Sequence, residues 1–180
     1  MKIVLIGIQG SGKSTQGDLL QKKLNIPFLA TGNIFRQLAK EENELGKYIR
    51  EYMFAGHLVP DEKVLQIVSE YLGKEEYKNG YILDGFPRTV KQAEAFGDDL
   101  SLVIYLKVSD EEALARISKR NDKARKDETK EAINRRITLF HKETEPVIEY
   151  YRQKGKLVEV DGEQSIEEIN KEILQKINGK

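Results

Sequence analysis

Short apolar runs alternate with longer amphipathic or polar stretches along the chain. The first run, Lys2–Ile6, is continuous and ends at Gly7, as is typical of a strand buried on both faces. Further strands are expected at Ile26–Leu29, Tyr81–Leu83, Leu102–Val108 and Lys156–Val160. Short apolar strands separated by helices predict a parallel sheet of five strands with helices on both faces, a three-layered α/β fold.

The stretches between these strands carry helix signals. Ser109 and Ser165 each open a capping box with an acid three residues later. Gly56 is placed to end a helix and Pro60 suits a first helical position, whereas Pro146 should bend or interrupt its helix. The helices are expected at Lys13–Leu24, Asn33–Lys40, Leu45–Phe54, Pro60–Leu72, Thr89–Phe96, Ser109–Arg120 and Asp127–Lys154, with a last one from Ser165.

Length and composition narrow the class of protein. The 180 residues fit one domain, and no apolar run reaches the roughly 18 residues of a membrane span, so we expect a soluble protein. The apolar N-terminal stretch is too short for a signal peptide, which argues against export. There is no cysteine, which excludes disulfides and thiolate metal sites and fits a reducing cytoplasm. Thirty basic and thirty acidic residues cancel, so a nucleic acid is not expected as the main partner.

The strongest chemical signal follows the first strand, in the segment Gly7–Thr15. Its sequence has a glycine, four residues and then Gly-Lys-Ser, the pattern of a phosphate-binding loop. Glycines let successive backbone N–H groups point at one phosphate chain, and the helix that follows adds the partial positive charge of its N-terminus. Lys13 supplies a mobile full charge, and Ser14 or Thr15 offers a hydroxyl to a magnesium ion. The segment therefore predicts phosphate binding.

An acid and an arginine follow the third predicted strand. Asp84 stands where an acid can hold the waters of a magnesium ion beside the phosphates. Arg88 can make bidentate contacts with a phosphate. Gln92 has two interpretations: it closes a capping box opened by Thr89, or its amide contacts the edge of a purine base.

These segments resemble the adenylate kinase family of nucleoside monophosphate kinases, and the resemblance covers essentially the whole chain. The string Leu83-Asp-Gly-Phe-Pro-Arg88 is highly specific to that family, and Gly7–Gln16 looks like its phosphate loop. Thr31–Arg36 and Gly56–Asp61 resemble the borders of its acceptor-binding insert. The resemblance implies a P-loop NTPase fold with a core (1–29, 60–119 and 128–180), an insert that binds the acceptor nucleoside monophosphate (30–59) and a short lid (120–127).

The resemblance also implies roles for individual residues. ATP would be bound by Gly10, Ser11, Gly12, Lys13, Ser14, Thr15, Arg116 and Arg120. AMP would be bound by Thr31, Arg36, Leu58, Val59, Gly85, Arg88, Gln92, Arg125 and Arg136. The catalytic set would be Lys13, Arg88, Arg120, Arg125 and Arg136. Mg²⁺ would be held by Ser14 and, through water, by Asp84. Cations suit this chemistry, because the transition state spreads negative charge over the transferred group.

The chain departs from the family pattern at two positions. Ser14 stands where the family often has glycine, which leaves open whether Ser14 or Thr15 faces the magnesium ion. Asn33 stands where the family commonly has an acid, so charge pairing near Arg36 is weakened. The lid is short, because only the four residues 121–124 separate the two arginines at its ends, and it leaves no room for a zinc site.

The expected activity is reversible phosphoryl transfer from MgATP to AMP, giving two ADP, by a cytoplasmic monomer that needs no membrane. A UMP/CMP kinase with the same mechanism is an alternative. A GTPase or ATPase hydrolase is another, although the chain has no Asn-Lys-x-Asp segment for reading guanine. A catalytically silent nucleotide-binding module is a third, and the presence of Lys13, Asp84 and the arginines argues against it.

The Lys13→Ala variant tests the expected phosphate loop. Removal of one group that stabilises the transition state should lower turnover by about 3 kcal/mol in activation free energy. The measurement is ADP formation from ATP and AMP. Unchanged turnover would contradict the assignment.

Overall fold

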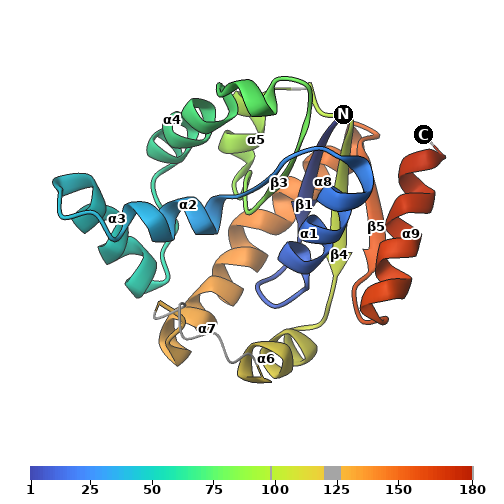
Figure 1. Cartoon of the computed structure of the whole chain (residues 1–180). Coiled ribbons are helices and arrows are strands. Elements are labelled where there is room, and N and C mark those ends of the chain that lie inside the picture. The colour runs from blue at the N-terminus through green and yellow to red at the C-terminus, as the bar shows by residue number, and fades with distance from the viewer. Residues whose placement is uncertain (98, 120–126, 180) are drawn as a thin grey trace.

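A five-stranded sheet lies at the centre of the molecule (Figure 1). The computed structural model describes residues 1–97, 99–119 and 127–179. The strands are β1 (Lys2–Ile6), β2 (Phe28–Ala30), β3 (Tyr81–Asp84), β4 (Leu102–Lys107) and β5 (Leu157–Asp161). Their order is β2-β3-β1-β4-β5 and every pairing is parallel, which confirms the predicted five-stranded parallel sheet.

Helices connect the strands. Those before β4 are α1 (Lys13–Leu24), α2 (Thr31–Leu38), α3 (Glu44–Ala55), α4 (Asp61–Leu72), the short 3₁₀ turn η1 (Glu75–Tyr77) and α5 (Val90–Phe96). Those after it are α6 (Asp110–Lys119), α7 (Lys130–Leu139), the π-helical turn η2 (Phe140–Thr144), α8 (Glu145–Gln153) and α9 (Ile166–Asn178). Within the described ranges, each helix is too short or too polar to cross a membrane.

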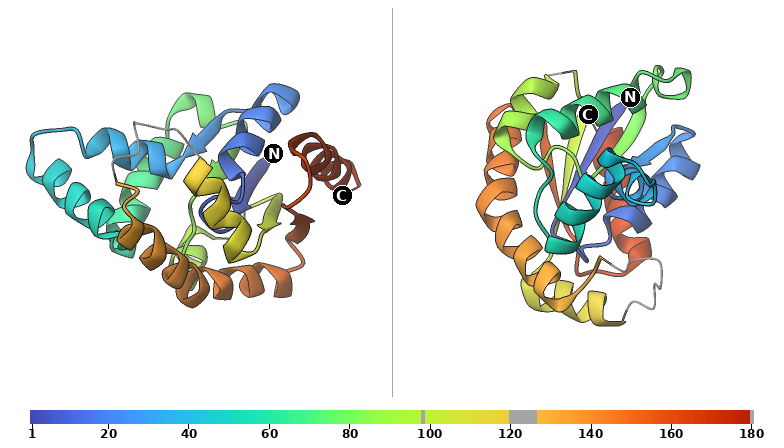
Figure 2. Two further views of the ribbon diagram at one scale, coloured as in Figure 1. Left: turned by 90° about the horizontal axis from the view of Figure 1, so that it is seen from below. Right: turned by 90° about the vertical axis from the view of Figure 1, so that its left-hand side faces the viewer.

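The central strand β1 shows why both faces of the sheet are covered. Successive side chains of a strand point to opposite faces, and all of Ile3–Ile6 is buried. Ile3 and Leu5 pack in one core with residues of α1 and α9. Val4 and Ile6 pack in a second core with residues of α4, α5 and α8. The sheet therefore lies between α1 on one side and α8 on the other (Figure 2, right), as the three-layered prediction requires.

The helices α2 and α3 project from one side of the sheet, at the opposite end of the molecule from α9 (Figures 1 and 2). Gly56 ends α3 in the left-handed conformation, as predicted, with φ 70°. A side chain there would place its Cβ 2.7 Å from the backbone oxygen of Ala132 in α7. Because Gly56 lacks a Cβ, the end of α3 can rest directly on α7.

The predicted long helix Asp127–Lys154 differs from the structure in where it begins and in where it is interrupted. It begins at Lys130, because Thr129 caps it by accepting a hydrogen bond from the backbone N–H of Ala132. It is also interrupted by η2, whose wider turn immediately precedes α8. Pro146 lies in the first turn of α8, where its missing N–H and its ring are tolerated. The proline thus interrupts the helix as expected, but the change in geometry falls before it.

Several other boundaries differ from the prediction by one or more residues. β2 is shifted toward Ala30, since Ile26 and Pro27 precede the strand. Pro60 lies just before the first residue of α4 instead of within it. The helix predicted from Asn33 begins at Thr31.

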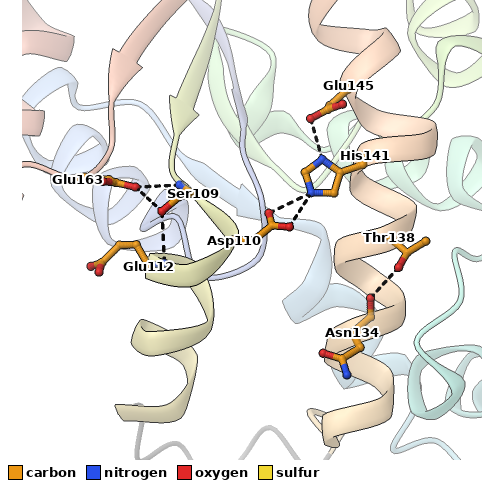
Figure 3. Close-up of polar contacts among 8 residues, drawn as sticks. All are labelled: Ser109, Asp110, Glu112, Asn134, Thr138, His141, Glu145 and Glu163. Carbon is orange, nitrogen blue, oxygen red and sulfur yellow. Dashed lines mark hydrogen bonds and ion pairs between the residues drawn. The ribbon is translucent and has the colours of Figure 1, made fainter.

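The two capping boxes have different outcomes. At Ser165 the box is complete, with both hydrogen bonds to Glu168. At Ser109 only half forms, since the Ser109 hydroxyl accepts from the backbone N–H of Glu112 at 3.3 Å while the Glu112 carboxylate pairs with Arg116. The backbone N–H of Ser109 instead donates to Glu163, from the segment after β5 (Figure 3). A residue distant in sequence therefore completes the cap.

His141, in η2, lies between two carboxylates from different elements (Figure 3). Its Nδ1 is 2.7 Å from Glu145 and its Nε2 is 2.9 Å from Asp110, the first residue of α6. The hydrogen bond to Glu145 raises the pKa of the imidazole above its ordinary value of 6.5; Asp110 adds to this rise, and partial burial opposes it. Protonated His141 therefore links the start of α6 to the start of α8.

This contact predicts a pH-dependent part of the stability. Because the folded-state pKa of His141 is raised, its contribution is full below the unfolded-state pKa and is lost as pH rises through the folded-state value. The measurement is urea unfolding of the unchanged chain and of His141→Gln between about pH 5.5 and about pH 8.5. The loss caused by the substitution should be larger at the acidic end.

The matched control carries Asp110→Asn and Glu145→Gln together, which keeps the histidine and removes both charges. In that background the effect of His141→Gln should no longer vary with pH. A loss of the same size at every pH in the unchanged background would contradict the expectation.

Candidate active site

The phosphate loop and Asp84 lie side by side because β1 and β3 are neighbours. Leu5 pairs with Asp84 in the sheet register, and the loop begins at Gly7. Gly10 and Gly12 have φ values of 93° and 92°, a conformation that other residues rarely adopt. The helix α1 starts directly after the loop, so its N-terminus points at the same place.

Two side chains of the loop face inward. The ammonium group of Lys13 donates to the backbone oxygens of Gly7 and Ile8, at 2.6 and 2.9 Å, and so lies within the loop. The Ser14 hydroxyl donates to the Asp84 carboxylate at 2.9 Å, while Thr15 is exposed. Of the two candidate hydroxyls, it is Ser14 that lies against the acid.

Ser14 and Asp84 have the chemistry that a magnesium ion needs. Hydroxyl and carboxylate oxygens are the ligands that Mg²⁺ prefers, and it is usually held by one or two protein groups together with phosphates and water. Within residues 1–97, 99–119 and 127–179, no group of three or more His, Cys, Asp or Glu side chains could hold a metal ion. The Ser14–Asp84 pair fits an ion whose remaining ligands are phosphates and water.

Three arginines from different elements influence one another electrostatically. Burial lowers the pKa of the Arg88 guanidinium, the charges of Arg136 and Arg36 lower it further, and Asp84 opposes them. Arginine nevertheless stays protonated in proteins. Cations held this close to one another create a local positive potential that favours an anion, although the whole chain is neutral.

Hydrogen bonds hold these arginines in place. Arg88 donates from Nε to the backbone oxygen of Gly85 at 2.7 Å. Arg136 donates to Asp127, which is buried, at 2.7 Å and to the backbone oxygen of Met53 in α3 at 2.8 Å. Arg136 thereby ties α7 to the projecting helices.

Arg36 is held by an amide. Its guanidinium donates to the side-chain oxygen of Asn33 at 2.8 Å. At the position where the family commonly has an acid, the asparagine thus keeps a hydrogen bond to the arginine but adds no charge.

These groups meet in one cavity. From the phosphate loop it is lined by Gly10, Gly12, Lys13, Ser14 and Thr15. From the rest of the predicted site it is lined by Arg36, Leu58, Val59, Asp84, Gly85, Arg88, Gln92 and Arg136. The cavity is thus lined by both a phosphate loop and a cluster of arginines, as two nucleotides meeting through their phosphates would need.

Comparison with known proteins agrees with this geometry. The sequence model of the adenylate kinase family matches residues 5–156. The chain belongs to the adenylate kinase family. An adenylate kinase from Caldicellulosiruptor bescii is 39% identical over 210 aligned positions, which cover 97% of this chain and 98% of that protein. One from Azobacteroides pseudotrichonymphae is 39% identical over 186 positions, covering 99% and 97%. Adenylate kinase 1 from Nostoc sp. is 39% identical over 180 positions, covering 96% of each.

Membership of the adenylate kinase family settles the reaction. The chain is an adenylate kinase enzyme, which converts ATP and AMP to two ADP. The family uses ATP together with magnesium, in agreement with the Ser14–Asp84 pair. The predicted reaction is confirmed over the alternatives left open by the sequence.

Some residues predicted for adenylate kinase chemistry lie outside the cavity. Ser11 is fully buried beneath the loop, where its backbone N–H donates to Ile8. Thr31 is buried, and its hydroxyl donates to the backbone oxygen of Asp84 at 3.0 Å. Arg116 pairs with Glu112 of its own helix at 2.7 Å. Arg120, Arg125 and the predicted lid up to residue 126 lie outside the described residues.

Gln92 forms one hydrogen bond of a capping box and also lines the cavity. Its backbone N–H donates to the Thr89 hydroxyl at 3.1 Å, as in a capping box. Its side-chain oxygen, however, accepts from the backbone N–H of Arg88 at 2.7 Å, and its nitrogen donates to Asp61 at 2.8 Å. The amide lines the cavity and at the same time fixes the backbone that carries Arg88.

Sequence reasoning missed several residues at the site. Gln9 and Glu128 line the cavity and are hydrogen bonded to each other, and Asp127 is the partner of Arg136. Gln9 could have been identified from the sequence, because it is a polar residue between two glycines of the loop. The acids after Arg125 could have been found by asking which carboxylates would balance the clustered arginines.

Proposed function

We propose that the cavity binds MgATP on the phosphate loop and AMP beside the projecting helices, with the phosphoryl group passing between them. The observation that carries this proposal is that Lys13, the Ser14–Asp84 pair and the arginine cluster all border one cavity. A phosphate loop alone would serve a hydrolase equally well. The arginines that line the same cavity supply a second anion site, which a transfer between two nucleotides requires.

On the donor side, backbone N–H groups of Gly10, Gly12 and Thr15 surround the phosphates, while the backbone N–H of Ser11 stays hydrogen bonded to Ile8 and holds the loop in shape. Lys13 is already inside the loop and needs only to exchange its backbone partners for phosphate oxygens. Ser14, and Asp84 through water, would hold Mg²⁺, which would supply charge neutralisation at the phosphates.

On the acceptor side, Arg36 and Arg88 bind the phosphate of AMP. Leu58 and Val59 line the same cavity and supply apolar contact for the base. Gln92 contacts the base edge through its amide. Thr31 supports the pocket through its hydrogen bond to Asp84, and Gly85 is needed because a Cβ there would lie 2.5 Å from the Thr31 hydroxyl oxygen.

During transfer, Arg136 stabilises the charge on the moving group, and Arg120 and Arg125 of the lid join it. Arg116 would stack near the donor base after exchanging its contact with Glu112 for the nucleotide. Such clamps act mainly through electrostatics, since covalent chemistry contributes little to phosphoryl transfer. No general base is required, because a phosphate monoester with a second pKa of about 6 is already mostly ionised at neutral pH.

The proposed division of the chain into insert, lid and core follows from the same assignments. The insert 30–59 carries α2 and α3, the lid spans 120–127, and the remaining ranges form the core. The neutral net charge supports the absence of a nucleic-acid partner, and the lack of cysteine supports a cytoplasmic protein without a zinc site. We assign a monomer, because ATP, AMP and ADP are the only partners that the chemistry needs.

The metal assignment can be tested with two neighbouring hydroxyls. Ser14→Ala removes the group that lies against Asp84, so the Mg²⁺ concentration for half-maximal activity should rise roughly 10-fold. Thr15→Ala should leave the Mg²⁺ dependence close to that of the unchanged chain, because its side chain faces solvent. The measurement is ADP formation during Mg²⁺ titration at fixed ATP and AMP. A shift with Thr15→Ala and none with Ser14→Ala would reverse the assignment.

A further inference from the structure

A side chain of the phosphate loop contacts the segment that follows the lid. The Nε2 of Gln9 donates to an Oε of Glu128 at 2.9 Å, between residues 119 positions apart. Both side chains line the cavity. The contact lies at the site itself and joins two parts of it that the sequence separates.

The orientation of the Gln9 amide is fixed by its partner. Only the nitrogen end can donate to a carboxylate, and the reverse orientation would place two acceptors against each other. The oxygen end is buried and has no hydrogen-bond partner among the residues that the structure describes. The amide oxygen of Gln9 is therefore left without a hydrogen bond, and the amide nitrogen is held by Glu128.

The contact is the first link in a chain across the site. Glu128 follows Asp127, which pairs with Arg136, and Arg136 donates to the backbone of Met53 in α3. The links join the donor loop, the end of the lid, the helix α7 and the acceptor insert. A change at Gln9 can thus reach Arg136 without touching it.

We propose that Gln9 is a positioning residue, which anchors the segment Asp127–Glu128 on the phosphate loop and so sets where Arg136 stands relative to the donor phosphates. The inference rests on the role proposed above for Arg136. Arg136 stabilises charge that develops during transfer, so its placement matters most in the transition state. Loosening the contact should therefore lower kcat more than it raises either KM.

The experiment uses Gln9→Ala, Gln9→Glu, Glu128→Gln and the swapped double variant Gln9→Glu/Glu128→Gln. Loss of a hydrogen bond to a charged group should lower kcat of Gln9→Ala roughly 10-fold, with smaller changes in KM for ATP and AMP. Gln9→Glu should lose more, because two carboxylates then face each other.

The double variant restores one amide and one carboxylate with their places exchanged. Its kcat should exceed that of Gln9→Glu roughly 10-fold, although it carries one substitution more. A double variant no faster than Gln9→Glu would overturn the proposal. So would an unchanged kcat in Gln9→Ala, or a rise in KM with kcat intact.

Two controls separate this role from general damage and from failure of the underlying assignment. Gln153→Ala removes a similar amide–carboxylate contact, to Glu149 at 3.2 Å on α8, and should leave kcat unchanged. Unfolding midpoints of all variants show whether a loss of kcat reflects loss of fold. Arg136→Ala tests the proposed function directly: if it leaves kcat intact, the role of Arg136 fails, whereas the Gln9 contact is decided by the swap.

Discussion

The parallel pairing of β1 with β3 is the contact on which the site depends. It places Asp84 opposite Leu5, and two residues after Leu5 the phosphate loop begins. On the other side of β3, Ala30 pairs with Asp84, so α2, which starts at Thr31, begins at the same end of these strands. A slip of one residue would turn Asp84 to the opposite face of the sheet and separate it from Ser14. The buried residues of β1 and β3 thus fix the register and, through it, the chemistry.

The second constraint is electrostatic. Burial lowers the pKa of the Arg88 guanidinium, and the charges of Arg136 and Arg36 lower it further, so Arg88 is held against charge repulsion from both. The fold holds them with Asp127, with Asn33 and with backbone oxygens, and these groups fix position while adding little negative charge. Donors held in this way need little rearrangement when charge develops, which is the basis of electrostatic catalysis. A chain without net charge thereby has a positively charged site, because its fold brings these arginines close together.

Local signals in the sequence were sufficient for much of the fold. The glycine loop, the Ser165 cap and the end of α3 at Gly56 all depend on residues close together in the chain, and the structure has them as predicted. Partners from distant segments could not be read in this way. Glu163 on Ser109 and Glu128 on Gln9 are examples, because nothing in either local sequence specifies the other.

The site shows the same division. The sequence was enough to identify the residues that carry a charge or a hydroxyl. Of the predicted arginines that the structure describes, Arg36, Arg88 and Arg136 line the cavity and Arg116 does not. The choice between Ser14 and Thr15 required the distance to Asp84, and the double use of the Gln92 amide required the backbone of Arg88.

The central claim is that the cavity brings MgATP and AMP together and passes a phosphoryl group between them. The most direct test is ATP consumption by the purified protein with Mg²⁺ and AMP, CMP, UMP or GMP in turn, beside a control without acceptor. Turnover should be largely confined to AMP. Comparable turnover with CMP or UMP would contradict the acceptor pocket, and ATP hydrolysis without an acceptor would contradict the role of the arginine cluster.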